Sequence, residues 1–131
     1  MWHSPGSITC KMLRTPVGVA ALAVLLSAGP ALTNSAIAVG QCDRYGYAYG
    51  YGSMGQARAE ALNQCAREGD RTCQIVVTVH SGCGALAVSG NCGSRGWAYA
   101  PSRGEAERIA LRECINHGGT NCTIRRWVCD N

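Results

Sequence analysis

The sequence lacks phenylalanine altogether and is poor in charge. Aromatic residues make up 6% of its 131 residues and charged residues 15%. Much of the apolar content is alanine, so the chain can bury only a small, light core and needs other sources of stability. The formal net charge is +4, and it falls to +2 when a leader that carries the single lysine, Lys11, and Arg14 is removed. That balance is too weak to indicate a nucleic-acid partner.

A hydrophobic run long enough for a transmembrane helix is also missing. The run Val17–Ala28 has 12 residues, whereas a helix that spans a bilayer needs about 20. Positive charges precede this run, Gly29-Pro30 breaks it, and Ala36-Ile37-Ala38 then supplies a small-x-small cleavage pattern. These features predict a signal peptide over residues 1–38 and a secreted mature chain that begins at Val39, with no stable membrane anchor. A retained anchor is the competing interpretation.

Cysteine, by contrast, is abundant. Of nine cysteines, Cys10 lies in the predicted leader, and the eight that remain are typical of four disulfides in an exported domain. No two cysteines stand two to four residues apart, and neither His80 nor His117 has a second histidine at ligand spacing. The sequence therefore predicts disulfides and no metal site.

The cysteine spacing occurs twice. Cys65 and Cys73 are matched 49 positions later by Cys114 and Cys122, and the segment Tyr47-Ala48-Tyr49 is matched by Trp97-Ala98-Tyr99. A repeat near 50 residues predicts one supersecondary unit used twice within a single domain, residues 39–131, with copies at about 42–90 and 91–131. Each short cysteine pair joins a helix end to a strand start, so local bonds are the simplest choice. Cross-pairing of Cys65 with Cys114 and of Cys73 with Cys122 is the alternative.

Each copy has the pattern strand, helix, strand. Residues 45–51 and 95–100 alternate in character, and the alternation predicts a row of tyrosines on one face of the first strand: Tyr45, Tyr47, Tyr49 and Tyr51. Ser53 with Gln56 and Ser102 with Glu105 form capping boxes that open helices over 54–68 and 103–117. Apolar strands follow at 73–80 and 122–129, and a further strand lies at 83–89. The order β-α-β-β-β-α-β predicts an α+β fold of duplicated β-α-β units, with two helices packed on one mainly antiparallel sheet.

These segments resemble a known family. The aromatic-Ala-Tyr strand, the capped alanine-rich helix that ends in cysteine, Cys83-Gly84-Ala85-Leu86-Ala87-Val88 and the terminal Trp127-Val128-Cys129-Asp130-Asn131 are similar to a bacterial secreted family catalogued as domain of unknown function 4189. The resemblance covers nearly all of residues 43–131. The family has no established reaction or catalytic residues. Some mycobacterial relatives are discussed as exported effectors that meet host cells, which implies an interaction role.

The resemblance also bears on the remaining cysteines. Relatives with fewer cysteines keep those that match Cys65, Cys73, Cys83 and Cys129. If these form two bridges, the resemblance implies a Cys83–Cys129 bond, which we expect to tie the two copies together, and it leaves Cys42 to pair with Cys92.

The segment Gly50-Tyr51-Gly52-Ser53-Met54-Gly55 fits the dinucleotide-binding pattern G-x-G-x-x-G. The next strand ends at His80 with no acidic residue to hold a ribose, and the second copy lacks the pattern. We interpret the segment as a capped turn and expect no cofactor.

Aromatic residues on the two equivalent strands are the best candidate binding surface. A twofold arrangement could set their rings on one sheet face, where they could stack on sugar rings or on apolar side chains. We therefore expect an exported, non-catalytic module that binds an envelope component, a glycan or a host protein. The competing interpretation is that these aromatic side chains are buried and pack in the hydrophobic core. An alternative function is a small secreted hydrolase or nuclease that uses His80 and His117. The candidate binding residues are Tyr45, Tyr47, Tyr49, Tyr51, Trp97 and Tyr99.

Overall fold

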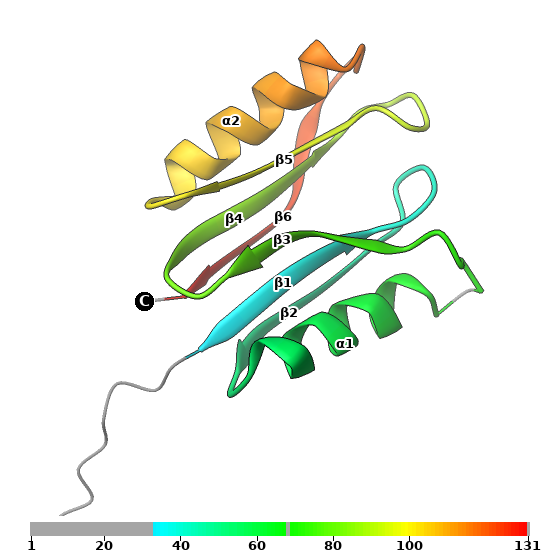
Figure 1. Cartoon of the computed structure of the whole chain (residues 1–131). Coiled ribbons are helices and arrows are strands. Elements are labelled where there is room, and N and C mark those ends of the chain that lie inside the picture. Colours follow the sequence, from blue (N-terminus) through cyan, green and yellow to red (C-terminus); the bar gives the residue numbers. More distant parts are fainter. Residues whose placement is uncertain (1–32, 68, 131) are drawn as a thin grey trace, which may run out of the picture.

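The computed structural model describes residues 33–67 and 69–130 (Figure 1). Its elements in chain order are β1 (Asn34–Val39), β2 (Tyr45–Tyr51), α1 (Met54–Cys65), β3 (Gln74–Val79), β4 (Gly82–Val88), β5 (Arg95–Ala100), α2 (Arg103–Asn116) and β6 (Thr123–Asp130). In this part of the chain no helix is long and apolar enough to cross a membrane.

The strands form two antiparallel sheets of three strands each, in the orders β2-β1-β3 and β5-β4-β6. Helix α1 covers the outer face of the first sheet and α2 the outer face of the second, and the inner faces pack against each other (Figure 1). The predicted α+β class with two helices is confirmed. The single sheet is not: each half of the chain has its own central strand and closes its own sheet around it.

Strand β1 was not predicted from the sequence. It is the central strand of the first sheet, and all six of its residues are buried. The pattern Ala36-Ile37-Ala38, interpreted above as a cleavage site, lies in the middle of this strand. Cleavage after Ala38 would remove five of the six residues of β1, so a boundary between residues 38 and 39 does not fit this fold. The rest of the predicted leader, residues 1–32, lies outside the described residues.

The two halves of the domain are built alike. Each has the order strand, strand, helix, strand, and each starts with its central strand, so the units begin at β1 and β4 and not near residues 42 and 91. The sequence Ala36-Ile37-Ala38-Val39 in β1 corresponds to Ala85-Leu86-Ala87-Val88 in β4. Both central strands also shift register at the corresponding place against the last strand of their half, after Ile37 and after Leu86.

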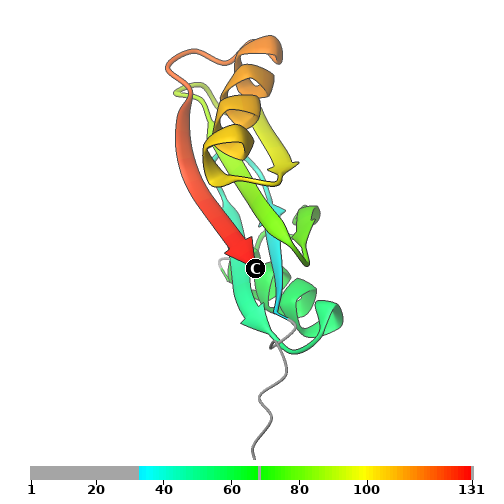
Figure 2. The ribbon, with the colours of Figure 1, turned by 90° about the vertical axis from the view of Figure 1, so that its left-hand side faces the viewer.

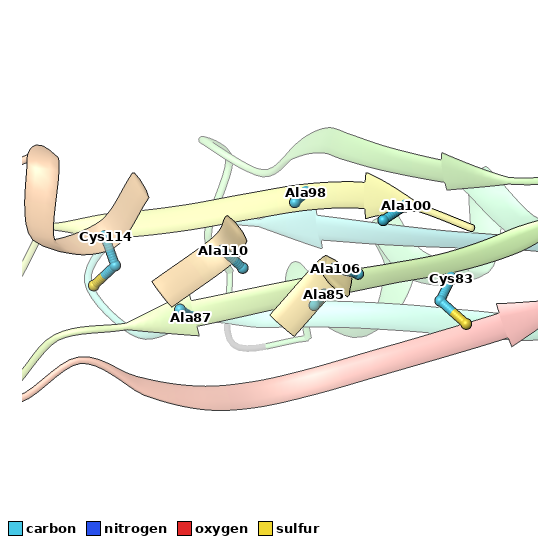
Figure 3. Close-up of a cluster of buried hydrophobic side chains, with 8 residues drawn as sticks. All are labelled: Cys83, Ala85, Ala87, Ala98, Ala100, Ala106, Ala110 and Cys114. Atoms are coloured by element: carbon cyan, nitrogen blue, oxygen red, sulfur yellow. The ribbon is translucent and has the colours of Figure 1, made fainter. Parts of the chain in front are cut away.

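Small residues let each helix lie directly on its sheet. In the second half, the buried residues between α2 and the sheet are six alanines and two cysteines (Figure 3). Gly46 in β2 and Gly96 in β5 face the helices, and a side-chain carbon at either would collide with the backbone oxygen of Ala61 or Ala110. At the helix starts, Ser53 and Ser102 accept hydrogen bonds from backbone N–H groups three residues on, as the capping pattern predicts.

Larger aliphatic side chains fill the space between the two sheets. The buried residues of this layer are Ile37, Val39, Val77, Val79, Leu86, Val88 and Val128. Each buried side chain of this size contributes about 1.5–3 kcal/mol relative to its exposed state. The contact between the halves is therefore the main apolar core of the domain.

The cysteines of residues 33–67 and 69–130 form four disulfides, and they are the four pairs expected above: Cys42–Cys92, Cys65–Cys73, Cys83–Cys129 and Cys114–Cys122. The expectation that Cys83–Cys129 joins the two halves is wrong, because it links the neighbouring strands β4 and β6 of one sheet. The bond between the halves is Cys42–Cys92. It connects the turn after β1 with the turn after β4.

The turn that carries Cys42 is anchored by a carboxylate. Asp70 accepts hydrogen bonds from the Thr72 hydroxyl at 2.5 Å and from the backbone N–H groups of Gln41 and Thr72, both at 2.8 Å. These bonds, led by that of the Thr72 hydroxyl, lower the pKa of Asp70 to about 2. Asp70 thereby ties the β1–β2 turn to the segment before β3.

Candidate binding groove between strands β2 and β6

The two aromatic strands do not share one sheet face. Strand β2 is an edge strand of the first sheet and packs against β6 of the second, whereas β5 packs against β3 (Figure 2). The predicted combined patch is therefore wrong. Because each half closes its own sheet, the corresponding strands β2 and β5 lie at two separate seams between the sheets.

The rings themselves are largely accessible. Tyr49 is 66% exposed, Tyr99 55% and Trp97 40%, while Tyr45 and Tyr47 are half-buried and pack against the layer between the sheets. Core filling therefore does not account for Tyr49, Trp97 and Tyr99.

Tyr51 is the exception to the predicted row. Strand β2 contains one extra residue before Tyr51, because Ala36 pairs with Ala48 whereas Asn34 pairs with Tyr51. Gly50, with φ of 75°, sits in this bulge. The extra residue turns Tyr51 to the helix side of the sheet, where it packs against the alanine-rich cluster under α1. The prediction that all four tyrosines lie on one face is wrong for Tyr51.

The other three tyrosines form a stack along β2. Neighbouring ring centroids of Tyr45, Tyr47 and Tyr49 are 6.4 and 6.3 Å apart, and the planes of Tyr47 and Tyr49 differ by 3°. This follows from the alternation of a strand, which places every second side chain on the same face. The guanidinium of Arg126 in β6 lies 3.5 Å from the ring centroid of Tyr47 and adds a cation–π contact between the halves.

Strand β6 contributes the opposite wall. Trp127 borders this wall from the α2 side of β6: it pairs with Ala85, is 40% exposed, and its ring centroid lies 3.8 Å from the guanidinium of Arg103, at the start of α2. Arg103 is held in place by an ion pair with Glu107 at 2.6 Å. Between the two strands is a groove of about 270 Å³, lined by Tyr47, Tyr49, Arg126, Trp127, Val128 and Cys129.

Arg126 gives this groove its polar character. The side chain is half-buried, and its Nε is buried without a hydrogen-bond partner among the described residues. A buried N–H group without a partner is costly, and such groups are uncommon in folded proteins. The sequence did carry a signal for this site: the alternation of β6 places Arg126 on the face of Val128, so a charged residue interrupts an apolar strand face.

The structure separates the two histidines. His80 Nδ1 lies 2.9 Å from Asn34 Oδ1, and His117 Nδ1 lies 2.7 Å from the backbone oxygen of Glu113. The backbone oxygen of His117 accepts a hydrogen bond from Ser94, before β5 begins. The chain then extends about 17 Å along β5 from Ser94 to Tyr99. The Tyr99 hydroxyl donates a hydrogen bond to the backbone oxygen of Ser81, the neighbour of His80. The arrangement does not place the two imidazoles around one substrate.

His80 has a structural role instead. Its position in the first half corresponds to that of Cys129 in the second, and Asn34 corresponds to Cys83. The His80–Asn34 hydrogen bond therefore stands where the second half has its Cys83–Cys129 disulfide.

Metal chemistry finds no support in the described ranges, 33–67 and 69–130. They contain no group of three or more His, Cys, Asp or Glu side chains that could hold a metal ion.

Comparisons with known proteins bear on the fold and the family. No curated protein matches the chain. The fold is similar to the NMR structure of Rv1813c from Mycobacterium tuberculosis, with 22% identity, a TM-score of 0.54, and coverage of 80% of this chain and 81% of that one. A family model described as domain of unknown function (DUF4189) matches residues 35–129, so the match begins inside β1. The chain belongs to this family.

Proposed function

We propose that this chain is an exported, non-catalytic binding module and that the groove between β2 and β6 holds its ligand, a protein segment or a glycan. The observation that carries the proposal is the combination of exposed aromatic rings with Arg126, whose Nε has no hydrogen-bond partner among the described residues. Four disulfides support export, because such bonds persist in oxidising compartments outside the cytoplasm.

The chemistry of the groove suits a ligand that has both a flat apolar face and an acceptor oxygen. The stacked rings of Tyr47 and Tyr49, with Trp127 at the rim, offer apolar surface at low cost in side-chain entropy, and their polar atoms can orient a ligand. Arg126 can donate to a carboxylate, a carbonyl or a hydroxyl oxygen, and charge-assisted hydrogen bonds are stronger than neutral ones. Aromatic residues and arginine are also the types that dominate binding hot spots.

A matched pair of tryptophans tests the location of the site. Trp127 lines the groove and Trp97 lies on β5, and both are 40% exposed. The oxidised protein is screened against a panel of defined oligosaccharides and against a displayed peptide library, and each hit is titrated with both alanine variants. Trp127→Ala should weaken binding by about 5- to 150-fold, the range for an aromatic hot spot, and Trp97→Ala by less than about twofold. Hits that depend on Trp97 and not on Trp127 would show that the site is elsewhere.

A second variant tests the role of Arg126. The corresponding residue of β3 is Val77, which is buried in the same layer between the sheets. Arg126→Val should therefore fold with its four disulfides and still lose binding. Unchanged affinity in the folded variant would show that the guanidinium does not contact the ligand.

A further inference from the structure

The disulfide between the halves is the accessible one. Cys42 and Cys92 are both exposed, whereas each of the other three bonds has one buried cysteine: Cys65, Cys83 or Cys114. Thiol–disulfide exchange requires that a thiolate reach one of the two sulfurs, so access selects which bond reacts first. Cys42 also has a φ of 55°, in the left-handed region that residues other than glycine disfavour.

The surroundings of this bond favour an incoming thiolate. A cleft of about 310 Å³ is lined by Cys42, Asp43, Ser89, Gly90, Asn91, Cys92, Ser94 and Arg125. Arg125 is exposed at this cleft and pairs loosely with Asp43 at 3.6 Å. A nearby cation lowers the pKa of a thiol and stabilises the thiolate that exchange releases, while the Asp43 carboxylate has the opposite effect.

Opening this bond does not require the domain to unfold. The other three disulfides each lie within one half, and the aliphatic layer between the sheets holds the halves together without it. Arg95 in β5 also donates a hydrogen bond to the backbone oxygen of Gly40 in the first half. Cys42–Cys92 is therefore the one disulfide of the described chain that links the halves. The aliphatic layer and the Arg95–Gly40 hydrogen bond also join the halves, and neither depends on this disulfide.

We propose that Cys42–Cys92 is a thiol–disulfide exchange site, reduced by an external dithiol while the rest of the domain stays oxidised and folded. In the first step a reductant thiolate attacks one sulfur and forms a mixed disulfide, and the other cysteine leaves as a thiolate. The second reductant thiol then attacks the mixed disulfide. The chain gains two electrons and two protons as two thiols, and the reductant becomes a disulfide.

The test is graded reduction of the full oxidised chain with dithiothreitol, followed by quenching with N-ethylmaleimide, peptide mapping and near-ultraviolet circular dichroism. Cys42 and Cys92 should be alkylated at least tenfold faster than the other paired cysteines, while the circular dichroism signal stays native. Alkylation of another pair first, or loss of the signal in step with labelling of Cys42, would overturn the proposal.

Charge variants and a cysteine control sharpen the test. Asp43→Asn should speed the reduction of this bond and Arg125→Gln should slow it, each by a few-fold, because they change the charge around the thiolate and leave the bond in place. A purely structural bond whose reduction follows unfolding would show rates that track the stability of these variants instead. The double variant Cys42→Ser with Cys92→Ser should fold and lack the fast phase. A fast phase that persists in this variant would assign exchange to another bond.

Discussion

Removal of residues up to Ala38 tests whether β1 belongs to the domain. A chain that starts at Val39 loses Asn34–Ala38, a stretch in which Ala36, Ile37 and Ala38 are fully buried. Truncation of a buried isoleucine to alanine alone costs about 2–5 kcal/mol, and a domain of this kind has about 5–15 kcal/mol in total. The deletion also takes the shared neighbour of β2 and β3 and leaves both strands without partners. We therefore expect this chain not to fold, whereas a chain that starts at Thr33 should.

The comparison is made by oxidative refolding of both chains, with near-ultraviolet circular dichroism and non-reducing peptide mapping. The longer chain should give the four native disulfides, and the shorter chain a mixture of pairings, because the first sheet no longer holds its cysteines in place. A native disulfide set and a native spectrum from the chain that starts at Val39 would refute the reasoning.

Export through a signal peptide, as proposed above, would require cleavage before β1. A peptidase that leaves β1 intact must cut before residue 34, and Gly29-Pro30-Ala31 supplies small residues at the two positions that such enzymes read. N-terminal sequencing of exported protein should therefore give a start at Leu32, after Ala31. A start at Val39 in a folded exported protein would contradict both the cleavage argument and the role of β1.

Three further predictions concern single positions in the fold. Gly46→Ala should lower the free energy of unfolding by about 1–3 kcal/mol in denaturant titration, because the added Cβ would collide with the α1 backbone. Gly104→Ala is the control and should not lower it, because no atom lies near the position of its Cβ. Asn34→Cys with His80→Cys should add a fifth disulfide, visible by peptide mapping, since these positions correspond to Cys83 and Cys129; two free thiols would contradict the correspondence. The hydrogen bonds that lower the pKa of Asp70 to about 2 stabilise the fold when the pH is above the unfolded-state pKa near 3.9. This stabilisation is lost as the pH falls towards about 2. Asp70→Asn should therefore flatten the stability curve between pH 4 and pH 2, and an unchanged slope there would contradict the assigned hydrogen bonds.

Local patterns in the sequence predicted the local structure. Ser53 and Ser102 mark helix starts because capping depends on a few neighbouring residues, and the two short cysteine pairs span a single loop. The central strand β1 was missed because Ala36-Ile37-Ala38 satisfies the chemistry of a cleavage site and of a buried strand equally well. The match of Ala36-Ile37-Ala38-Val39 to Ala85-Leu86-Ala87-Val88 could have decided between these interpretations.

The partition into two sheets depends on contacts that no local pattern records. Alternation of side chains predicts two faces for each strand, but it does not say which strand covers the inner face. Once β1 is present, each half has a central strand with two neighbours and a helix for one face only. The uncovered faces are aliphatic, so they pack against each other, and β2 comes to lie against β6. The groove is a product of that packing.

The two seams carry different side chains, which is why we propose the β2–β6 seam and not the β3–β5 seam as the binding site. Both seams carry an aromatic strand, with Tyr47 in β2 and its counterpart Trp97 in β5. The facing strands differ: β6 presents Arg126 and Trp127, and the corresponding residues of β3 are Val77 and Thr78. Valine fills the layer between the sheets, whereas arginine brings a charge whose Nε has no hydrogen-bond partner among the described residues. Arg126 is therefore the residue that sets the β2–β6 seam apart and the one on which we base the proposed binding site.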